Sequence, residues 1–223
     1  MEEVVKQRDI LVREVHHRIK NNLQGLWSLI QLEKRRQGCG AGRDRLDALE
    51  GRIQVMAEIH KSLYASESLS MVDIGEQLRT LCDRIRSISP RPELLTIKVV
   101  ADPIRCDLDT AIPLGMLVHE IVTNSVKHAF PDDRPGKIAV SLRRDGDTVR
   151  LIARDDGEGD GSAQAGGQDS IGKQLIVSLS EQLCGRITVS DQAGTTVTVD
   201  MPAAMFSHAD WNADASIPVV EPA

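Results

Sequence analysis

Apolar residues recur at helical spacing through the first part of the chain. The first stripe consists of Val5, Val12, Ile19 and Leu26, seven residues apart, and is widened by Val15, Leu23 and Ile30. The second stripe alternates by three and four residues and consists of Leu46, Leu49, Ile53, Met56, His60 and Leu63. Such spacing is typical of two helices that share a coiled-coil-like seam. The glycine-rich segment "QGCGAG" (residues 37–42) lies between the stripes and predicts a turn, so we expect a helical hairpin.

The hairpin has one apolar stripe on each helix, and two such helices cannot enclose a core. We therefore expect two copies of the hairpin to pair into a dimeric four-helix bundle. The polar segment "SESLS" (residues 66–70) marks a boundary, so we assign residues 1–66 to a dimerisation module.

Beyond this boundary the pattern mixes helices and strands. We expect a helix over 72–88 ended by "SPRP", a strand over 94–101, and a long helix within 110–130 that starts near Pro113. A strand hairpin over 137–156 turns at Asp145-Gly146, and the glycine-rich segment 157–172 leads into a further helix and two strands around "QAGT". The fold class is α+β, with a two-layer α/β sandwich over residues 67–205 and an acidic C-terminal tail over 206–223.

Composition and charge limit the possible functions. Hydrophobic residues make up 41% and charged residues 27% of the chain, which is typical of a globular protein. The net charge is −6: residues 1–66 carry 12 basic and 9 acidic residues, and the remainder carries 15 and 24. This acidic body argues against nucleic acid as a partner. No apolar run approaches the roughly 18 residues of a membrane span, the N-terminus is too charged for a signal peptide, and the four cysteines are widely separated, so we expect a cytoplasmic protein with reduced thiols.

Two adjacent histidines stand out in "VREVHHRIKNN" (residues 12–22). At about 100° per residue, His16 lies roughly 55° from the centre of the apolar stripe and His17 roughly 155° from it. His17 is therefore expected to face solvent, with Glu14 about one turn before it on the same face. A neutral imidazole is a good nucleophile near pH 7, and a nearby carboxylate can accept its proton.

A second group of polar residues lies in the long helix, in "HEIVTNSVKHAF" (residues 119–130). Glu120 and Asn124 are four residues apart and share a helix face, and Lys127 and His128 follow one turn later. A carboxamide oxygen is a suitable ligand for Mg²⁺, and a lysine nearby can neutralise phosphate charge.

Glycines follow the predicted strand "VRLIARDD" and suggest a place where a ligand approaches the backbone. Asp155 would emerge at the strand end, with Gly157 and Gly159 just beyond it. Gly172 opens the next helix, whose N-terminal amides could meet phosphate, and Thr195 ends the tight turn "AGT" between the last strands. Each of these features is weak alone, but their order along the chain is specific.

The segment "REVHHRIKNNLQ" resembles the phosphoacceptor box of bacterial sensor histidine kinases, in the HWE-like branch where the box reads His-Arg-x-Lys-Asn. In that family the acceptor is the histidine before Arg, which is His17 here; His16 is the alternative. The ordered motifs that follow resemble a GHKL-type ATP-binding domain. The resemblance spans about residues 8–202 and implies that Asp155 reads the adenine amino group, that Asn124 holds Mg²⁺ and that the segment 157–172 closes over the phosphates. His119 and Lys173 depart from the usual Asn and apolar residue of the family.

The resemblance implies a two-component histidine kinase. It would phosphorylate His17 from Mg-ATP, with Glu14 or Glu120 as base because Arg18 replaces the usual acid after the acceptor. The nucleotide set comprises Asn124, Lys127, His128, Asp155, Gly157, Gly159, Gly172 and Thr195. The phosphoryl group would pass to an aspartate of a separate response-regulator receiver domain, and the input could come from a separate sensor protein. Two alternatives stay open: an ATP-independent phosphotransfer or phosphatase adaptor, and a GHKL kinase of Ser or Thr.

Overall fold

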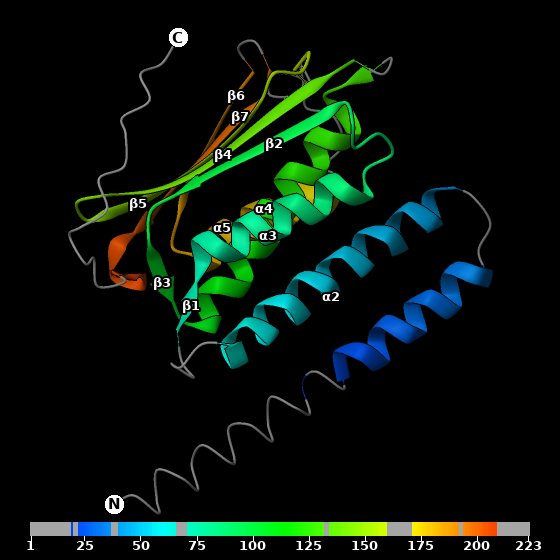
Figure 1. The fold of residues 1–223 in the computed structure, drawn as a ribbon, viewed down its shortest axis with the longest axis horizontal. Coiled ribbons are helices and arrows are strands. Elements are labelled where there is room, and N and C mark those ends of the chain that lie inside the picture. Colours follow the sequence, from blue (N-terminus) through cyan, green and yellow to red (C-terminus); the bar gives the residue numbers. More distant parts are fainter. Residues whose placement is uncertain are drawn as a thin grey trace, which may run out of the picture.

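The computed structural model describes residues 19, 22–36, 40–65, 71–131, 134–159, 171–191 and 194–208. A five-stranded sheet has the order β2 (Leu95–Ala101), β4 (Gly136–Asp145), β5 (Thr148–Asp155), β7 (Thr196–Pro202) and β6 (Arg186–Ser190). β2 and β4 are parallel, and the other neighbours are antiparallel. Three helices, α3 (Ile74–Ile88), α4 (Leu108–His128) and α5 (Ile171–Gln182), cover one face of the sheet (Figure 1). The two-layer sandwich predicted from the sequence is confirmed.

The sheet packs against the helices because buried and less buried side chains alternate along its central strands β4, β5 and β7. In β4, Ile138, Val140 and Leu142 are buried, whereas Lys137 and Arg143 are exposed on the other face. The buried side chains of the strands and of α3 and α4 form one continuous core. This core fixes α4 relative to the ends of β5 and β7, where the candidate site lies.

Aspartate side chains set the starts of the two long helices of this domain. Asp73 Oδ1 accepts a hydrogen bond from the Glu76 amide at 3.0 Å and caps α3. Asp107 Oδ1 accepts one from the Thr110 amide at 2.9 Å and caps α4. The prediction that α4 starts near Pro113 is therefore wrong by five residues: the cap at Asp107 begins the helix earlier and leaves the proline inside it. The predicted β4–β5 turn is present.

A small second sheet was not expected from the sequence. It contains β1 (Val72–Asp73), β3 (Ile104–Cys106) and β8 (Ser207–His208), in the order β1-β3-β8. These strands are two or three residues long, too short to show an alternating pattern. β8 falls within the range expected for the tail, and Phe206 before it is only 5% exposed, so the folded domain extends to His208. Residues 209–223 of the expected tail lie outside the described residues.

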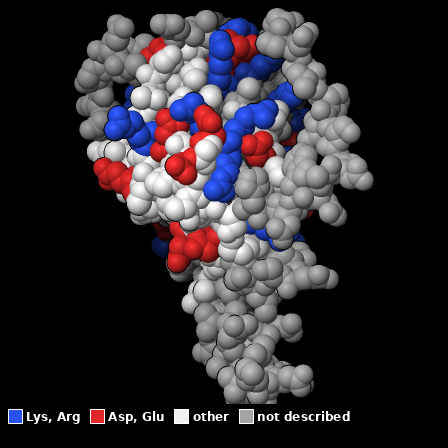
Figure 2. Space-filling model, turned by 90° about the vertical axis from the view of Figure 1, so that its left-hand side faces the viewer, with Lys and Arg blue, Asp and Glu red and all other residues white. Residues whose placement is uncertain are grey.

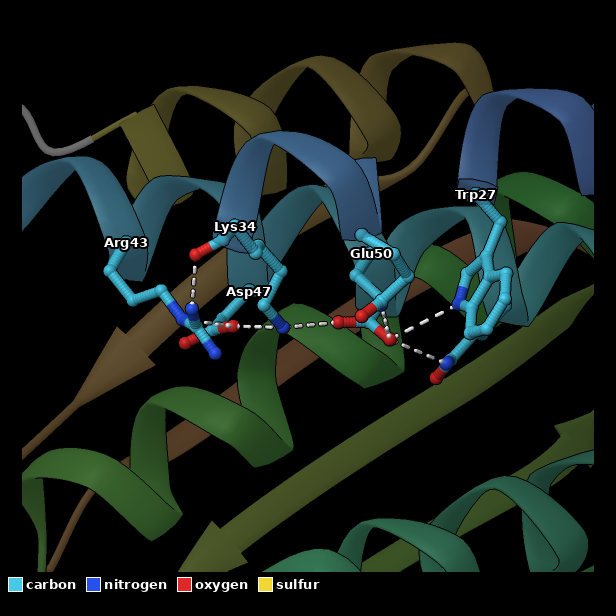
Figure 3. Close-up of polar contacts among 7 residues, drawn as sticks. Trp27, Lys34, Arg43, Asp47 and Glu50 are labelled. Carbon is cyan, nitrogen blue, oxygen red and sulfur yellow. Dashed lines mark hydrogen bonds and ion pairs between the residues drawn. The ribbon is translucent and has the colours of Figure 1, made fainter. Parts of the chain in front are cut away.

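The helical hairpin consists of a helix over residues 22–36 and α2 (Ala41–Ala65). Glu50 of α2 holds the two helices together: its carboxylate accepts hydrogen bonds from Trp27 Nε1 at 3.1 Å, from Gln31 Nε2 at 2.6 Å and from Lys34 Nζ at 2.5 Å (Figure 3). Lys34 Nζ also forms an ion pair with Asp47. These contacts fix the register of the two helices.

α2 has a neighbour on each of two faces. Ile30 and Ile53 are buried within the hairpin, as the apolar stripes predict. Leu26 and Leu49 were expected in the same seam but are 50% and 43% exposed in the single chain. Val55 and Ile59 are only 3% exposed because they pack into the core of the sandwich domain, on the side of α3 and α4 away from the sheet (Figure 1). The sequence did not predict this second interface.

Surface charge is mixed. On the face drawn in Figure 2, Lys and Arg side chains lie next to Asp and Glu side chains. None of the helices in the described ranges has the length and apolar character needed to cross a bilayer.

Candidate nucleotide-binding site

Asp155 is the last residue of β5 and is only 2% exposed. Its Oδ2 accepts a hydrogen bond from Ser125 Oγ of α4 at 2.7 Å. Its Oδ1 accepts hydrogen bonds from the Gly157 amide at 3.1 Å and the Thr195 amide at 3.0 Å. A carboxylate has about four acceptor positions. Three are used here, so the carboxylate is held in one orientation and can still accept a hydrogen bond from a ligand amine.

Glycines are required around this carboxylate. A Cβ on Gly157 would lie 2.5 Å from the carbonyl oxygen of Ala129, so a larger residue would push the strand end away from α4. Gly194 has a φ of +96°, and a Cβ there would lie 2.1 Å from the carbonyl oxygen of Asp155. Gly159 has a φ of +73°, which only glycine adopts easily. The local sequence therefore brings β5, β7 and α4 into close backbone contact at Asp155.

A second cluster lies on α4 beside the first turn of α5. Gly172 faces both Glu120 and Asn124: a Cβ on it would lie 3.6 Å from Glu120 Oε2 and 3.8 Å from Asn124 Oδ1 and Nδ2. The structure thus brings together three residues that the sequence predicted as one site from positions about fifty residues apart. Lys127 and His128 are exposed in the last turn of the same helix.

Glu120 is occupied by a partner that the sequence did not suggest. Its Oε1 accepts a hydrogen bond from Arg52 Nε at 2.8 Å and its Oε2 one from Arg52 Nη2 at 3.1 Å. The side chains of Glu120 and Arg52 are 7% and 17% exposed. This two-point ion pair crosses from α2 of the hairpin to α4 of the sandwich domain.

His119 lies beside this ion pair and is 8% exposed. Its ring packs against α2, where a Cβ on Gly51 would lie 2.4 Å from Nε2. Its Nδ1 has no hydrogen-bond partner among the described residues. Burial is the main cause that lowers the pKa of His119 from 6.5 to about 4; Glu120 raises it, and Arg52, Lys127 and Arg84 lower it further. His119 is therefore neutral at pH 7.

Several predicted residues lie outside the described part of the chain. These are the acceptor His17, its alternative His16, the candidate base Glu14, and residues 160–170 of the glycine-rich segment. Lys173, which departs from the family pattern, lies half-buried in the first turn of α5.

The residues at hand fit a nucleotide with its metal ion. A buried carboxylate with a free acceptor position suits the adenine amino group, and Asn124 offers one hard oxygen. No group of three or more His, Cys, Asp or Glu side chains within the described ranges could hold a metal ion. Mg²⁺ does not need such a cage, because it keeps water and phosphate oxygens as most of its ligands.

Two residues of the site were missed from the sequence. Ser125 donates a hydrogen bond to Asp155, which lies thirty residues later in the sequence. Arg52 forms an ion pair with Glu120, which lies sixty-eight residues later. Ser125 directly follows the predicted Asn124, but a lone serine in a helix gives no signal. The pairing of Arg52 with Glu120 could not be predicted, because it depends on how the hairpin packs against the sandwich domain.

The known proteins that this chain is similar to are histidine kinases. A family model described as "Histidine kinase" matches residues 14–89, and one described as "Histidine kinase-, DNA gyrase B-, and HSP90-like ATPase" matches residues 109–205. The chain is 30% identical over 202 residues to the sensor histidine kinase PdtaS of Mycobacterium tuberculosis, covering 87% of this chain and 40% of that protein. It is 27% identical to the blue-light-activated histidine kinase 2 of Erythrobacter litoralis, covering 87% of this chain and 57% of that protein.

A solved structure shows the same fold. The histidine kinase domain of the Erythrobacter litoralis EL346 blue-light-activated kinase superposes with a TM-score of 0.66 at 25% identity, covering 91% of this chain and 95% of that chain. The present chain spans about half the length of the curated relatives it matches.

Proposed function

Because the chain belongs to the histidine kinases and carries a GHKL-type ATPase domain, we propose that it is a two-component kinase that phosphorylates His17 from Mg-ATP. The phosphoryl group then passes to an aspartate on the receiver domain of a separate response regulator. The protein acts in the cytoplasm, where ATP and such regulators are found.

The observation that carries this proposal is the fixed carboxylate of Asp155. Three protein donors hold it in one orientation, and it lies next to the helix that presents Asn124. The remaining acceptor position of this carboxylate supports a role in binding a ligand amine. We assign Asp155 to the adenine amino group, Asn124 to Mg²⁺, and the start of α5 at Gly172, with Lys127 and His128, to the phosphates. Gly157, Gly159 and Thr195 complete the site.

The reaction needs few covalent steps from the protein. A ring nitrogen of His17 donates its lone pair to the γ-phosphorus, the bond from that phosphorus to the bridging oxygen breaks, and ADP leaves with the electron pair. The ring proton passes to a carboxylate, for which Glu14 and Glu120 are the candidates. Bound Mg²⁺ would neutralise charge on the phosphate oxygens. The chain itself contributes mainly by positioning the histidine and the nucleotide for transfer.

The hairpin supplies the surfaces for partners. Leu26, Leu29 and Leu32 are 50%, 63% and 56% exposed on its first helix, and Leu49 is 43% exposed on α2. These side chains would be covered if two hairpins pair into a four-helix dimer. The same hairpin would present the phosphorylated histidine to the receiver domain. The input comes either from a further part of the same protein or from a separate sensor protein.

Incubation with γ-labelled ATP and Mg²⁺ tests the proposal, with His17→Ala and His16→Ala as matched variants. We expect acid-labile label that is lost only in His17→Ala. Label lost only in His16→Ala would move the acceptor by one residue. A folded protein that takes up no label would contradict the kinase, and one that also binds no Mg-ATP would favour an ATP-independent phosphotransfer adaptor. Acid-stable label on a partner would indicate a Ser or Thr kinase instead.

A further inference from the structure

The ion pair between Arg52 and Glu120 connects the two modules at the edge of the candidate site. Glu120 lies one helical turn before Asn124 and faces the start of α5 through Gly172. The guanidinium of Arg52 approaches Glu120 from the side of α2 and binds both of its oxygens, at 2.8 and 3.1 Å. The ion pair holds this carboxylate towards α2 and next to a positive charge, so it is poorly placed to take a proton from an incoming histidine.

The surface that carries Arg52 is a built interface. We call it the α2–α4 interface, formed by Gly51, Arg52, Val55 and Ile59 of α2 and by Gly115, His119 and Glu120 of α4. Glycines allow close approach at two places: Gly51 faces the ring of His119, and a Cβ on Gly115 would lie 2.6 Å from Ile59 Cδ1. Val55 and Ile59 are each 3% exposed. Arg52 is thus held by packing on both sides, unlike an exposed ion pair, which contributes little.

A second ion pair, between Arg84 of α3 and Glu58 of α2, lies in the same region. Its side chains are 34% and 30% exposed, so it is more accessible than the pair at Glu120. The two pairs bind α2 to two different helices of the sandwich domain. Together with the apolar contacts they define one docked arrangement of the modules.

This docked arrangement is not the one expected for phosphoryl transfer. Gln31 and Lys34 reach Glu50, so Arg52 lies level with the part of the first helix near residue 30. His17 precedes residue 30 by thirteen positions, and the sequence predicts a continuous helix there. Thirteen residues of helix extend about 20 Å. On that prediction the polar face of α4 must leave this part of α2 before it can meet His17.

We propose that Arg52 is a positioning residue that holds Glu120 out of phosphoryl transfer while α2 and α4 are docked. The inference rests on the proposed function and concerns its regulation. Separation of α2 from α4 breaks the ion pair, frees the carboxylate, and releases the sandwich domain to move along the hairpin. Arg52 acts through Glu120 and through the docked arrangement, and it is not itself a catalytic residue.

The test compares the full chain with Arg52→Ala, Arg52→Lys and Arg45→Ala. Arg45 is an exposed arginine of the same helix and serves as the matched control. Initial rates of acid-labile labelling at several Mg-ATP concentrations give the maximal rate and the half-saturating concentration. A fluorescent ATP analogue gives nucleotide affinity separately.

We expect Arg52→Ala to raise the maximal rate about threefold or more, with nucleotide affinity within about twofold, because docking no longer competes with transfer. Arg52→Lys should fall between Arg52→Ala and wild type, since lysine keeps the charge but not the two-point geometry. Arg45→Ala should match wild type. A maximal rate for Arg52→Ala at or below that of wild type overturns the proposal. If Arg52→Ala does not fold, Arg52→Lys decides by the same criterion.

A second readout needs no ATP and separates this inference from the kinase proposal. Amide hydrogen exchange over residues 52–59 of α2 should be faster in Arg52→Ala than in Arg45→Ala, because undocking exposes this stretch. Unchanged exchange overturns the inference even if the protein proves to be an active kinase. Faster exchange in a chain that binds no nucleotide would uphold the docking role of Arg52 and contradict the proposed function alone.

Discussion

Acidification should destabilise the protein through His119. The ring is 8% exposed, and its pKa is lowered from 6.5 to about 4, first by burial and then by the nearby Arg52, Lys127 and Arg84 against the opposing effect of Glu120. The unfolded state therefore binds a proton at a higher pH than the folded state does. The stability that the neutral ring contributes is fully present above pH 6.5 and is lost as the pH falls from 6.5 towards 4.

The size of this effect follows from the two pKa values. A shift of one pKa unit corresponds to about 1.4 kcal/mol of stability. Between about pH 7.5 and about pH 5, the free energy of unfolding therefore falls by the equivalent of roughly 1.5 units, or about 2 kcal/mol. Part of this loss would appear as separation of α2 from α4, because the ring packs against Gly51.

The assay is urea unfolding of wild type and His119→Gln at both pH values. Glutamine keeps a polar side chain of similar length but does not titrate. Carboxylates titrate in both proteins, so their contribution largely cancels in the comparison. We expect wild type to lose about 2 kcal/mol more than the variant on acidification. Equal losses in the two proteins would show that His119 is not buried as a neutral ring and would refute the reasoning.

Three further predictions concern the site and the thiols. Gly194→Ala should destabilise by about 2 kcal/mol or more and abolish nucleotide binding, whereas Gly146→Ala, at a φ of +57° in open space, should cost only about 1 kcal/mol; equal urea midpoints would contradict this. Ser125→Ala should weaken binding of a fluorescent ATP analogue and cost about 1–3 kcal/mol, since a buried carboxylate oxygen loses its donor, and unchanged affinity would remove the serine from the site. Burial raises the pKa of the Cys82 and Cys106 thiols to about 12, so iodoacetamide at about pH 8 should label them only in urea, as peptide mass spectrometry would show.

The elements that the sequence predicted well are those whose burial follows one period. β4 and β5 alternate over their whole length, and α3 has its apolar residues on one face, so pattern alone locates them. β1, β3 and β8 have two or three residues each, and their pairing depends on segments more than thirty residues apart. No local pattern contains that information.

The same limit applies to the candidate site. The order of the motifs that contain Asn124, Asp155 and Gly157 resembles that of GHKL-type domains, and that resemblance predicted that they form one site. The hydrogen bonds that fix Asp155 could not be predicted, since the Ser125 hydroxyl and the Thr195 amide reach it only through the packing of α4 and the β7 turn against β5. The ion pair of Arg52 was even less predictable from the sequence, because Arg52 and Glu120 belong to different modules. The sequence predicted Glu120 as one of two candidate bases, beside Glu14, and did not predict the ion pair that the structure shows.

The position of Arg52 on α2 also explains how one helix can connect two surfaces. Glu50 binds the first helix of the hairpin, and Arg52, two residues later, binds α4. Two residues correspond to about 200° around a helix, so these side chains lie on opposite faces of α2. A rigid helix cannot move with one neighbour and keep its contacts with the other unless both move together. A displacement of the first helix relative to α4 that keeps its hydrogen bonds to Glu50 must therefore carry α2 with it and pull Arg52 away from Glu120.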